Sequence, residues 1–273
     1  MEKYSIWQAD LHLHTKLSFC APQTTDAASY FPVCEEEGIT VLGFSDHIYP
    51  ANYITERNIP EGNGAAYSLR LKPELEELRK TTNIRLLMGG ESEMFYGQEP
   101  ALTYEDAKDF DYVLLAASHI LNMPREYVNY DLSTPEKLRK MVLDQFYNAC
   151  HFEYPVPVGI CHPLYPLCSP YEQEVVDGIT DSQLADCFTL AAKRNRSIEI
   201  HACLFRKGTA LDKDGLSPTY MRVLAAAKAC GCKFHFGSDA HEPAAFVGTH
   251  RLLHLAAEKV GITPEDMWEL PIK

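Results

Sequence analysis

Short runs of apolar residues alternate along the chain with longer segments whose apolar positions recur at helical spacing. The apolar runs predict strands at residues 6–11, 40–44, 85–88, 112–116, 156–160, 197–200 and 233–236. Helical spacing predicts helices that include residues 75–79, 135–147, 181–194 and 218–230. Such alternation is typical of βαβ units and a parallel sheet. Seven repeats therefore predict an α/β protein whose strands form a closed or nearly closed barrel.

Local signals predict where two of these helices begin. Pro135 follows Ser133 and Thr134 and suits the first position of a helix, where its missing N–H is not needed. Asp181 or Ser182 is predicted to cap the next helix, because a short polar side chain can accept hydrogen bonds from the first free N–H groups.

Length and composition suit one such barrel. The chain has 273 residues, of which 46% are hydrophobic and 23% charged, as in an ordinary globular protein. No linker-like segment divides it. We therefore expect residues 1–273 to form a single barrel domain.

The pattern of cysteines and the N-terminal sequence indicate in which cellular compartment the protein lies. Nine cysteines are scattered along the chain without a CxxC pair, which is typical of reduced thiols and not of a disulfide framework. The N-terminus has no basic segment followed by an apolar one. No apolar run approaches the ~20 residues that cross a membrane. We expect a cytoplasmic protein with no membrane partner.

The net charge narrows the class of substrate. With a net charge of −13, the protein would repel a long polyanion over most of its surface. Nucleic-acid binding depends on neutralisation of phosphates by Lys and Arg. We therefore expect no long nucleic acid as a partner. A small anionic substrate remains compatible if bound cations make the site positive.

Histidines gather at the predicted strand ends. Seven of the 11 lie at or just past the C-terminal end of a predicted strand: His12, His14, His47, His119, His162, His201 and His241. Glu91 and Glu93 follow the third strand, and Asp239 precedes the last histidine of the set. The C-terminal ends of parallel strands meet at one rim of a barrel, where active sites lie. Imidazole and carboxylate are ligands for zinc and similar ions, whereas acids clustered without a cation would repel one another.

A single histidine at a strand end is more often a structural residue held by hydrogen bonds. His12 and His14, however, are two positions apart in a strand, so their side chains point to the same side. The complete set of histidines and acids favours a metal centre over coincidence. The other four histidines are predicted not to be ligands: His151, His235, His250 and His254.

In order along the chain, these motifs resemble those of the PHP (polymerase and histidinol phosphatase) family. The matching segments are Asp10-Leu-His12-Leu-His14-Thr15, Ser45-Asp46-His47, Gly90-Glu91, His119, His162-Pro163 and Gly237-Ser238-Asp239-Ala240-His241. They run from residue 10 to residue 241, which is nearly the whole chain. The resemblance implies a distorted (β/α)7 barrel of the TIM type, with a trinuclear metal centre at the C-terminal rim of the strands.

The resemblance also implies a set of ligands. One ion would be bound by His12, His14, Glu91 and Asp239. A second would be bound by Glu91, His119 and His162, so that Glu91 bridges the two ions. A third would be bound by His47, His241 and one residue from the loop after His14. We expect two or three divalent ions, zinc first, with manganese or iron as alternatives.

The chain departs from the family pattern at two positions. Relatives often have a histidine in the loop after His14, where Cys20 is the candidate here, and a thiolate there would favour zinc. Relatives commonly have an amide at the end of the sixth strand, where this chain has His201. Arg206 lies in a stretch that resembles the one where family phosphatases place a phosphate-binding arginine.

The expected reaction is hydrolysis of a small phosphate monoester by a metal-activated hydroxide, as in histidinol phosphatases. Glu91, His201 and Arg206 are the candidate catalytic residues: the bridging carboxylate, the general acid and the phosphate ligand. Asp10, Asp46 and Glu199 are expected to orient the metal ligands.

Three other functions are also compatible with the sequence. Phosphodiester hydrolysis, including a nuclease acting on short nucleotides, uses the same kind of centre. A metal-dependent amidohydrolase also begins with an HxH pair, although it typically bridges its metals through a modified lysine, and no lysine follows the fourth strand. A metal sensor without catalysis is the third alternative. The sequence leaves the exact substrate and the oligomeric state open.

Overall fold

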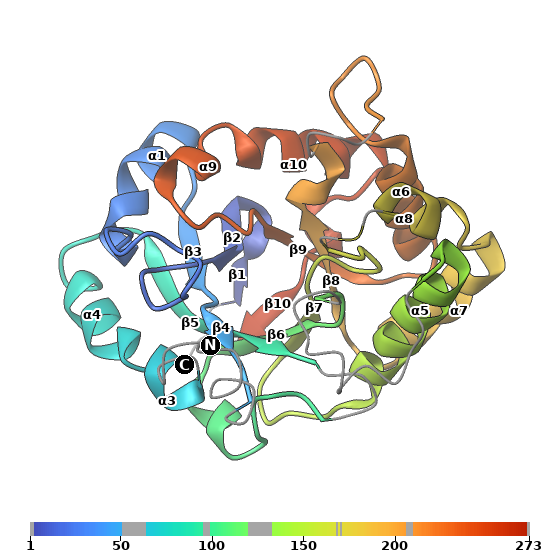
Figure 1. Ribbon diagram of the computed structural model, residues 1–273. Coiled ribbons are helices and arrows are strands. Elements are labelled where there is room, and N and C mark those ends of the chain that lie inside the picture. The colour runs from blue at the N-terminus through green and yellow to red at the C-terminus, as the bar shows by residue number, and fades with distance from the viewer. Residues whose placement is uncertain are drawn as a thin grey trace.

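Seven parallel strands form the centre of the computed structural model, which describes residues 3–50, 64–94, 99–119, 133–167, 169, 171–205 and 210–271 (Figure 1). In spatial order they are β2 (Ala9–Leu13), β3 (Val41–Phe44), β5 (Arg85–Glu93), β6 (Tyr112–Ala116), β7 (Val158–Ile160), β8 (Ser197–His201) and β9 (Lys233–Gly237). The short β4 (His47–Ile48) pairs with the second half of β5. The protein is thus an α/β barrel of seven successive strands, as predicted.

The first and last strands of the barrel meet beyond their ends. The backbone N–H of His14 donates to the carbonyl of Ala240 (3.0 Å), and that of Asp239 donates to the carbonyl of His12 (2.8 Å). A parallel bridge joins Leu13 to Ala240. The barrel is therefore nearly closed, and its seam lies among the candidate metal ligands.

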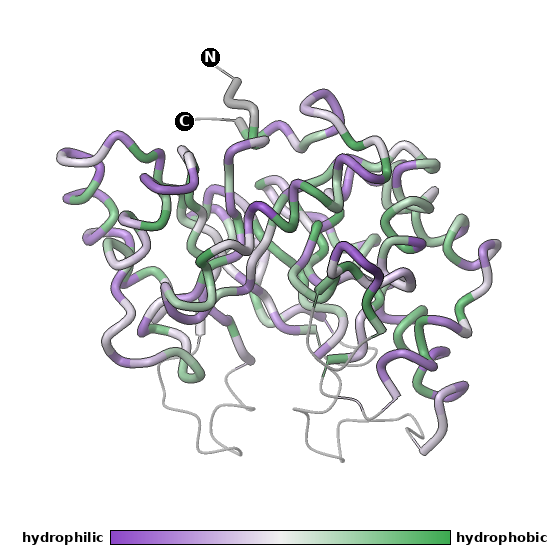
Figure 2. The backbone as a smooth tube through the Cα atoms, turned by 90° about the horizontal axis from the view of Figure 1, so that it is seen from above, coloured by the Kyte–Doolittle hydropathy of each residue, from purple (hydrophilic) through white to green (hydrophobic). Residues whose placement is uncertain are grey.

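Helices surround the strands (Figure 1). They are α1 (Phe31–Glu37), α3 (Ala65–Ser68), α4 (Leu71–Leu78), α5 (Pro135–His151), α6 (Glu172–Asp177), α7 (Asp181–Lys193), α8 (Pro218–Ala229), α9 (Pro243–Phe246) and α10 (Thr249–Lys259). Hydrophobic and hydrophilic segments alternate along them, as expected of helices that cover a core on one side (Figure 2). In the described part of the chain, no helix is both long enough and apolar enough to cross a membrane.

A second, two-stranded sheet joins the two ends of the chain. β1 (Lys3–Ser5) pairs antiparallel with β10 (Glu269–Pro271), which places both termini at the same end of the barrel (Figure 2). Just before β10, the backbone N–H of Trp268 donates to the carbonyl of Phe234 in β9 (2.7 Å). Backbone hydrogen bonds thus tie the C-terminal segment both to the barrel and to the first strand.

One tyrosine fills the barrel interior. Tyr112 is buried, and its hydroxyl donates to the carbonyl of Leu11 (2.6 Å). A Cβ at Gly43 or Gly89 would overlap the Tyr112 side chain. Glycine is therefore required at these two strand positions, because the interior has room for the ring only where the neighbouring strands have no side chain.

Several predicted boundaries need correction. Residues 6–8 form a 3-10 helix, η1 (Ile6–Gln8), and the first barrel strand begins at Ala9. β5 continues through Glu93, so that Glu91 and Glu93 lie within the strand and not after it. Helix α5 begins at Pro135 as predicted. Helix α7 is capped by Thr180, which forms a capping box with Gln183, and not by Asp181 or Ser182.

Candidate metal centre

The carboxylate of Glu91 lies at the middle of the C-terminal rim. Five imidazole rings surround it, those of His12, His14, His47, His119 and His162. Oε1 lies 2.9 Å from Nε2 of His162 and 3.8 Å from Nε2 of His119. Oε2 lies 2.5 Å from Nδ1 of His47. Glu91 is thus the residue that all parts of the candidate centre share.

The first predicted ligand set comes together around β2 and the seam of the barrel. One side-chain atom each of His12, His14 and Asp239 lies within 4.8 Å of the others. Nε2 of His14 is 3.0 Å from Oδ1 of Asp239, and Nε2 of His12 is 3.7 Å from the same oxygen. Oε2 of Glu91 is 3.6 Å from Nε2 of both histidines. The four side chains therefore face one small volume.

The second predicted set faces the other oxygen of Glu91. The rings of His119 and His162 stack with their centroids 4.7 Å apart. Cys161 lies behind them, and its thiol donates to Oε1 of Glu91 (3.6 Å). Burial, together with the charge of Glu91, raises the pKa of Cys161 well above its usual value. Cys161 therefore acts as a protonated donor to Glu91, although it is close enough to His12 and His162 to be considered a ligand.

The third predicted set lies nearer the surface. His47 and His241 come together with His14, which was assigned to the first set alone. Sγ of Cys20 lies 3.0 Å from Nε2 of His241. Burial raises the pKa of the Cys20 thiol, but the hydrogen bonds from His241 and His47 outweigh it and lower the pKa to about 6. The structure thus brings the Cys20 thiol beside His241, with hydrogen bonds that favour its ionised form.

Glu93 borders the centre, although the predicted ligand sets did not include it. Its side chain is buried, and its two oxygens lie 2.7 and 2.9 Å from Nδ1 of His119. Oε1 is also 3.3 Å from Nδ1 of His47. The signal was present in the sequence, because Glu91 and Glu93 are two positions apart in one strand, as His12 and His14 are.

Hydrogen bonds at Nδ1 fix the orientation of four of the rings. Nδ1 of His12 faces Glu199 (2.6 Å), that of His119 faces Glu93, and that of His241 faces the carbonyl of Asp239 (2.9 Å). Carboxylates and carbonyls only accept, so each Nδ1 must donate. With the proton held on Nδ1, Nε2 is the nitrogen whose lone pair becomes available when the ring is neutral, the form that binds a metal.

The fourth ring, that of His14, is held through Ser18. The Ser18 hydroxyl donates to Asp46 (2.7 Å), so its oxygen accepts from Nδ1 of His14 (2.9 Å). Asp10 accepts from the backbone N–H groups of His12 and Ser238 (3.0 Å each). The three acids expected to orient the ligands, Asp10, Asp46 and Glu199, therefore all contact a ligand or its neighbours.

Two features show that these residues fit divalent cations. Nε2 of His12, Nε2 of His14 and Oε2 of Glu91 are buried without a hydrogen-bond partner, which is costly unless an ion binds them. In the described part of the chain, every ion pair of Glu91, Glu93, Glu199 and Asp239 is with histidine, none with Lys or Arg. Burial raises the pKa of Glu91, but His47, His12 and His119 lower it well below its usual range, so the carboxylate is ionised.

The backbone is strained at two of these residues. His162 has φ = 32° and Asp239 has φ = 55°, in a region that non-glycine residues rarely adopt. Such strain costs of order 1–3 kcal/mol and concentrates at functional sites. The conformation of both residues is therefore in keeping with a site that fixes the direction of a side chain.

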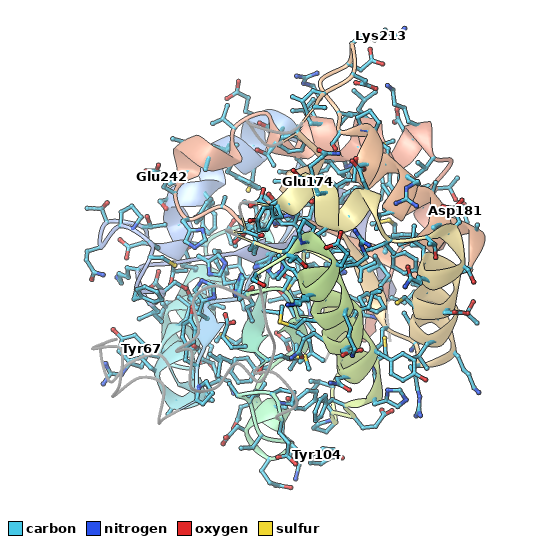
Figure 3. All side chains as sticks on the ribbon, turned by 45° about the vertical axis from the view of Figure 1, so that its right-hand side comes forward. Tyr67, Tyr104, Glu174, Asp181, Lys213 and Glu242 are labelled. Carbon is cyan, nitrogen blue, oxygen red and sulfur yellow. The ribbon has the colours of Figure 1, made fainter. Side chains whose placement is uncertain are left out.

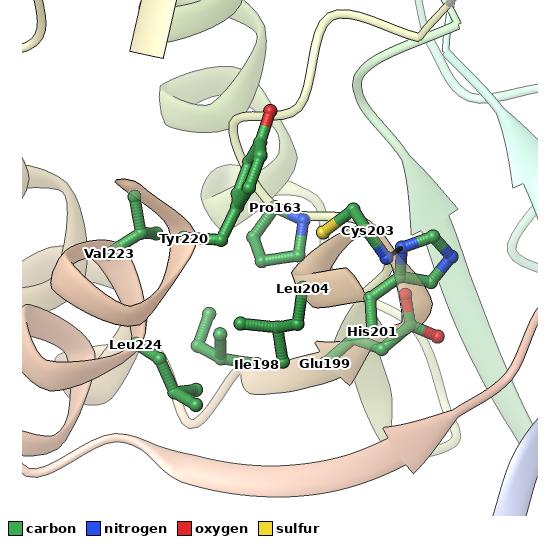
Figure 4. Close-up of a pocket in the computed structure, with 9 residues that line it drawn as sticks. All are labelled: Pro163, Ile198, Glu199, His201, Cys203, Leu204, Tyr220, Val223 and Leu224. Atoms are coloured by element: carbon green, nitrogen blue, oxygen red, sulfur yellow. Dashed lines mark hydrogen bonds between the residues drawn. The ribbon is translucent and has the colours of Figure 1, made fainter. Parts of the chain in front are cut away.

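The other two candidate catalytic residues are His201 and Arg206. Nε2 of His201 lies 3.5 Å from Oδ2 of Asp239, at the edge of the first set. Its other face borders a small apolar cavity of about 20 Å³ between β8 and α8, lined by residues such as Ile198, Leu204 and Val223 (Figure 4). Arg206 lies outside the described residues. The histidines predicted not to be ligands, His151, His235, His250 and His254, are in none of the candidate groups.

No family model and no curated protein sequence matches the chain. Solved structures do match it, over most of its length. A histidinol phosphate phosphatase from Lactococcus lactis, complexed with zinc, L-histidinol and phosphate, is 16% identical over 93% of this chain and 94% of its own (TM-score 0.61). A protein from Listeria monocytogenes assigned as a histidinol phosphatase is 14% identical over 89% of this chain and 99% of its own (TM-score 0.63). At these identities the likeness establishes the fold.

Proposed function

We propose that residues 1–273 form one metal-dependent phosphomonoesterase domain of the histidinol-phosphatase type. The observation that carries this proposal is the arrangement around Glu91, where histidines from all three proposed ligand sets surround one buried carboxylate. A single structural ion needs only about four ligands. A larger cluster with a shared carboxylate is typical of centres that hold several ions for hydrolysis.

The geometry supports the ligand sets that the resemblance implies. His12, His14, Glu91 and Asp239 would hold one ion, Glu91, His119 and His162 a second, and Cys20, His47 and His241 a third. Imidazole, carboxylate and thiolate together favour zinc. The Lactococcus structure was solved with zinc, which supports the same choice here. When bound, such ions lower the pKa of a water ligand and neutralise phosphate oxygens.

His201 is proposed as the general acid and not as a ligand. The backbone N–H of Cys203 donates to Nδ1 of His201 (3.0 Å), so Nδ1 has no proton and the ring carries it on Nε2 (Figure 4). A protonated Nε2 has no lone pair for a metal. It points toward Asp239 at the rim, where its N–H can donate a hydrogen bond to the leaving oxygen of an ester and stabilise the charge that develops there.

The substrate is proposed to be a small phosphate monoester. The phosphate would occupy the rim beside Glu91, with Arg206 as a further proposed contact. The cavity behind His201 has room for about one water molecule, so the alcohol part of the substrate would lie on the open side of the rim. L-histidinol and phosphate in the Lactococcus structure support histidinol phosphate as the first compound to try. The eight described cysteines are free thiols, which supports the cytoplasm as the compartment.

The test is phosphate release from a panel of small monoesters and diesters. The protein is purified without chelator and assayed with added zinc, manganese or iron. The proposal predicts release from monoesters that a chelator abolishes and metal restores. Bound metal without release from any monoester would contradict it. Release from diesters alone would place the protein among phosphodiesterases.

A further inference from the structure

We infer that Glu93 and Glu199 are paired positioning residues, each of which holds ligands of two different ion positions from outside the centre. The inference rests on the metal centre of the proposed function but not on its substrate. Glu199 lies in β8, and Glu93 lies in β5, two positions after Glu91. Neither is needed as a direct ligand in the proposed scheme.

Glu199 links the first and second positions. Its Oε1 accepts from Nδ1 of His12 at 2.6 Å, and its Oε2 accepts from the backbone N–H of His162 at 2.5 Å. The second bond holds the backbone of His162 in its strained conformation. A Cβ at Gly237 would overlap the Glu199 carboxylate, so the adjacent strand is kept free of a side chain at this point.

Glu93 links the second and third positions. Both of its oxygens lie within hydrogen-bond distance of Nδ1 of His119 (2.7 and 2.9 Å). Its Oε1 is also 3.3 Å from Nδ1 of His47. Glu93 is therefore placed to fix the ring of His119 with Nδ1 outward, so that Nε2 of His119 faces Glu91. Nδ1 of His47 lies between the carboxylates of Glu93 and Glu91, 2.5 Å from Oε2 of Glu91.

Only a carboxylate can serve both neighbours in each case. The groups that face Glu93 and Glu199 are ring and backbone nitrogens, and an ionised carboxylate offers two acceptor oxygens to them. A glutamine of the same shape offers one acceptor and one NH2 group, which would face a second donor. Replacement by Gln should therefore disturb two ion positions at once, while the third position keeps its support.

The experiment compares zinc binding by the wild type, Glu93→Gln and Glu199→Gln at buffered free-zinc concentrations. The matched control is Glu242→Gln, which removes an equal charge from an exposed residue next to His241 at the start of α9 (Figure 3). We expect each test variant to bind two ions about 10–100-fold more weakly, the usual effect of losing an outer partner of a ligand. The control should titrate like the wild type.

A second measurement identifies the positions affected. Nitrogen NMR of the zinc-loaded histidines distinguishes a ring protonated at Nδ1 from one protonated at Nε2. In Glu93→Gln we expect the signals of His119 to change and those of His12 to stay, and in Glu199→Gln the reverse. The zinc-loaded wild type, which needs no variant to fold, should show both rings protonated at Nδ1.

A test variant that titrates like the control would overturn the inference, as would a wild-type His119 protonated at Nε2. Identical loss of all ions and all histidine signals in both variants would also overturn it, because a general loss of structure has no positional pattern. A wild-type chain that binds no zinc would instead overturn the metal centre of the proposed function.

Discussion

Nε2 of His14 and Oδ1 of Asp239 lie 3.0 Å apart, and both atoms are hydrogen-bond acceptors. The proton of His14 is on Nδ1, which donates to Ser18. Burial, His241 and His47 lower the pKa of His14 well below its usual value, so the ring is neutral. A lone pair thus faces a carboxylate, and a cation between the two atoms would resolve their repulsion.

Asp239→Asn should separate metal binding from folding stability. The new amide can donate to Nε2 of His14, and Asn tolerates the positive φ at this position. One added hydrogen bond of about 1 kcal/mol should raise the melting temperature of the metal-free protein by roughly 2–4 °C. The further stabilisation by zinc should largely disappear. Thermal unfolding with and without zinc measures both, and a variant that zinc stabilises as much as the wild type would contradict the assignment.

Cys20 should react as a thiolate at neutral pH in the metal-free protein. Its pKa of about 6 lies below the usual value of roughly 8.5, because the hydrogen bonds from His241 and His47 outweigh the effect of burial. Alkylation by iodoacetamide should therefore reach half its maximal rate near pH 6, and zinc should suppress it. Peptide mapping locates the product, with Cys20→Ser as the control. Equal alkylation of Cys20 with and without zinc would remove it from the third ligand set.

His201→Gln should affect poor leaving groups most. A general acid contributes about 10²–10⁴-fold when the leaving alkoxide needs a proton. We expect kcat to fall in that range for alkyl phosphates and much less for p-nitrophenyl phosphate, whose leaving group is stable without a proton. Metal content should not change, since Nε2 is not a proposed ligand. An equal loss of kcat for both substrates would assign His201 a role other than proton transfer.

His250 should make the protein less stable in acid. It is buried beside β2, its Nε2 donates to the carbonyl of Ala9 (3.0 Å), and burial lowers its pKa from 6.5 to about 4. Between these values the unfolded chain binds the proton and the folded chain does not, so stability falls as pH falls from 6.5 toward 4. At pH 5 the loss is about 2 kcal/mol relative to pH 8.

His250→Gln keeps a donor for Ala9 but does not titrate. Urea unfolding of metal-free protein at pH 8 and pH 5 should therefore show about 2 kcal/mol less pH dependence in the variant than in the wild type. The same pH dependence in both proteins would show that His250 is protonated in the folded state.

The sequence predicted the barrel and most of the candidate centre, for one physical reason. Strand ends of a parallel barrel share a rim, so His12, Glu91, His162 and Asp239 could be brought together without knowledge of any contact. The extent of β5 could not be predicted, because its second half is held by β4 and β6 and not by its own pattern. Glu93 was named with Glu91 as an acid after the third strand, but it was given no role in the centre.

Other features depend on contacts between distant segments. The 3-10 helix at Ile6–Gln8 follows a strand that pairs with β10, more than 260 positions along the chain, so local apolar spacing gave the wrong boundary. The direction of each imidazole could likewise not be predicted from the sequence, because it depends on partners such as Glu199, which holds His12. The role of Arg206 stays a prediction from the sequence.

The central claim is that a metal cluster organised by Glu91 hydrolyses phosphate monoesters. The most direct test measures bound metal per chain and phosphate release from histidinol phosphate for the wild type and Glu91→Gln in parallel. The account predicts that the wild type holds two or three ions and releases phosphate, whereas the variant holds fewer ions and loses nearly all turnover. A variant that keeps its full metal content and unchanged turnover would contradict it.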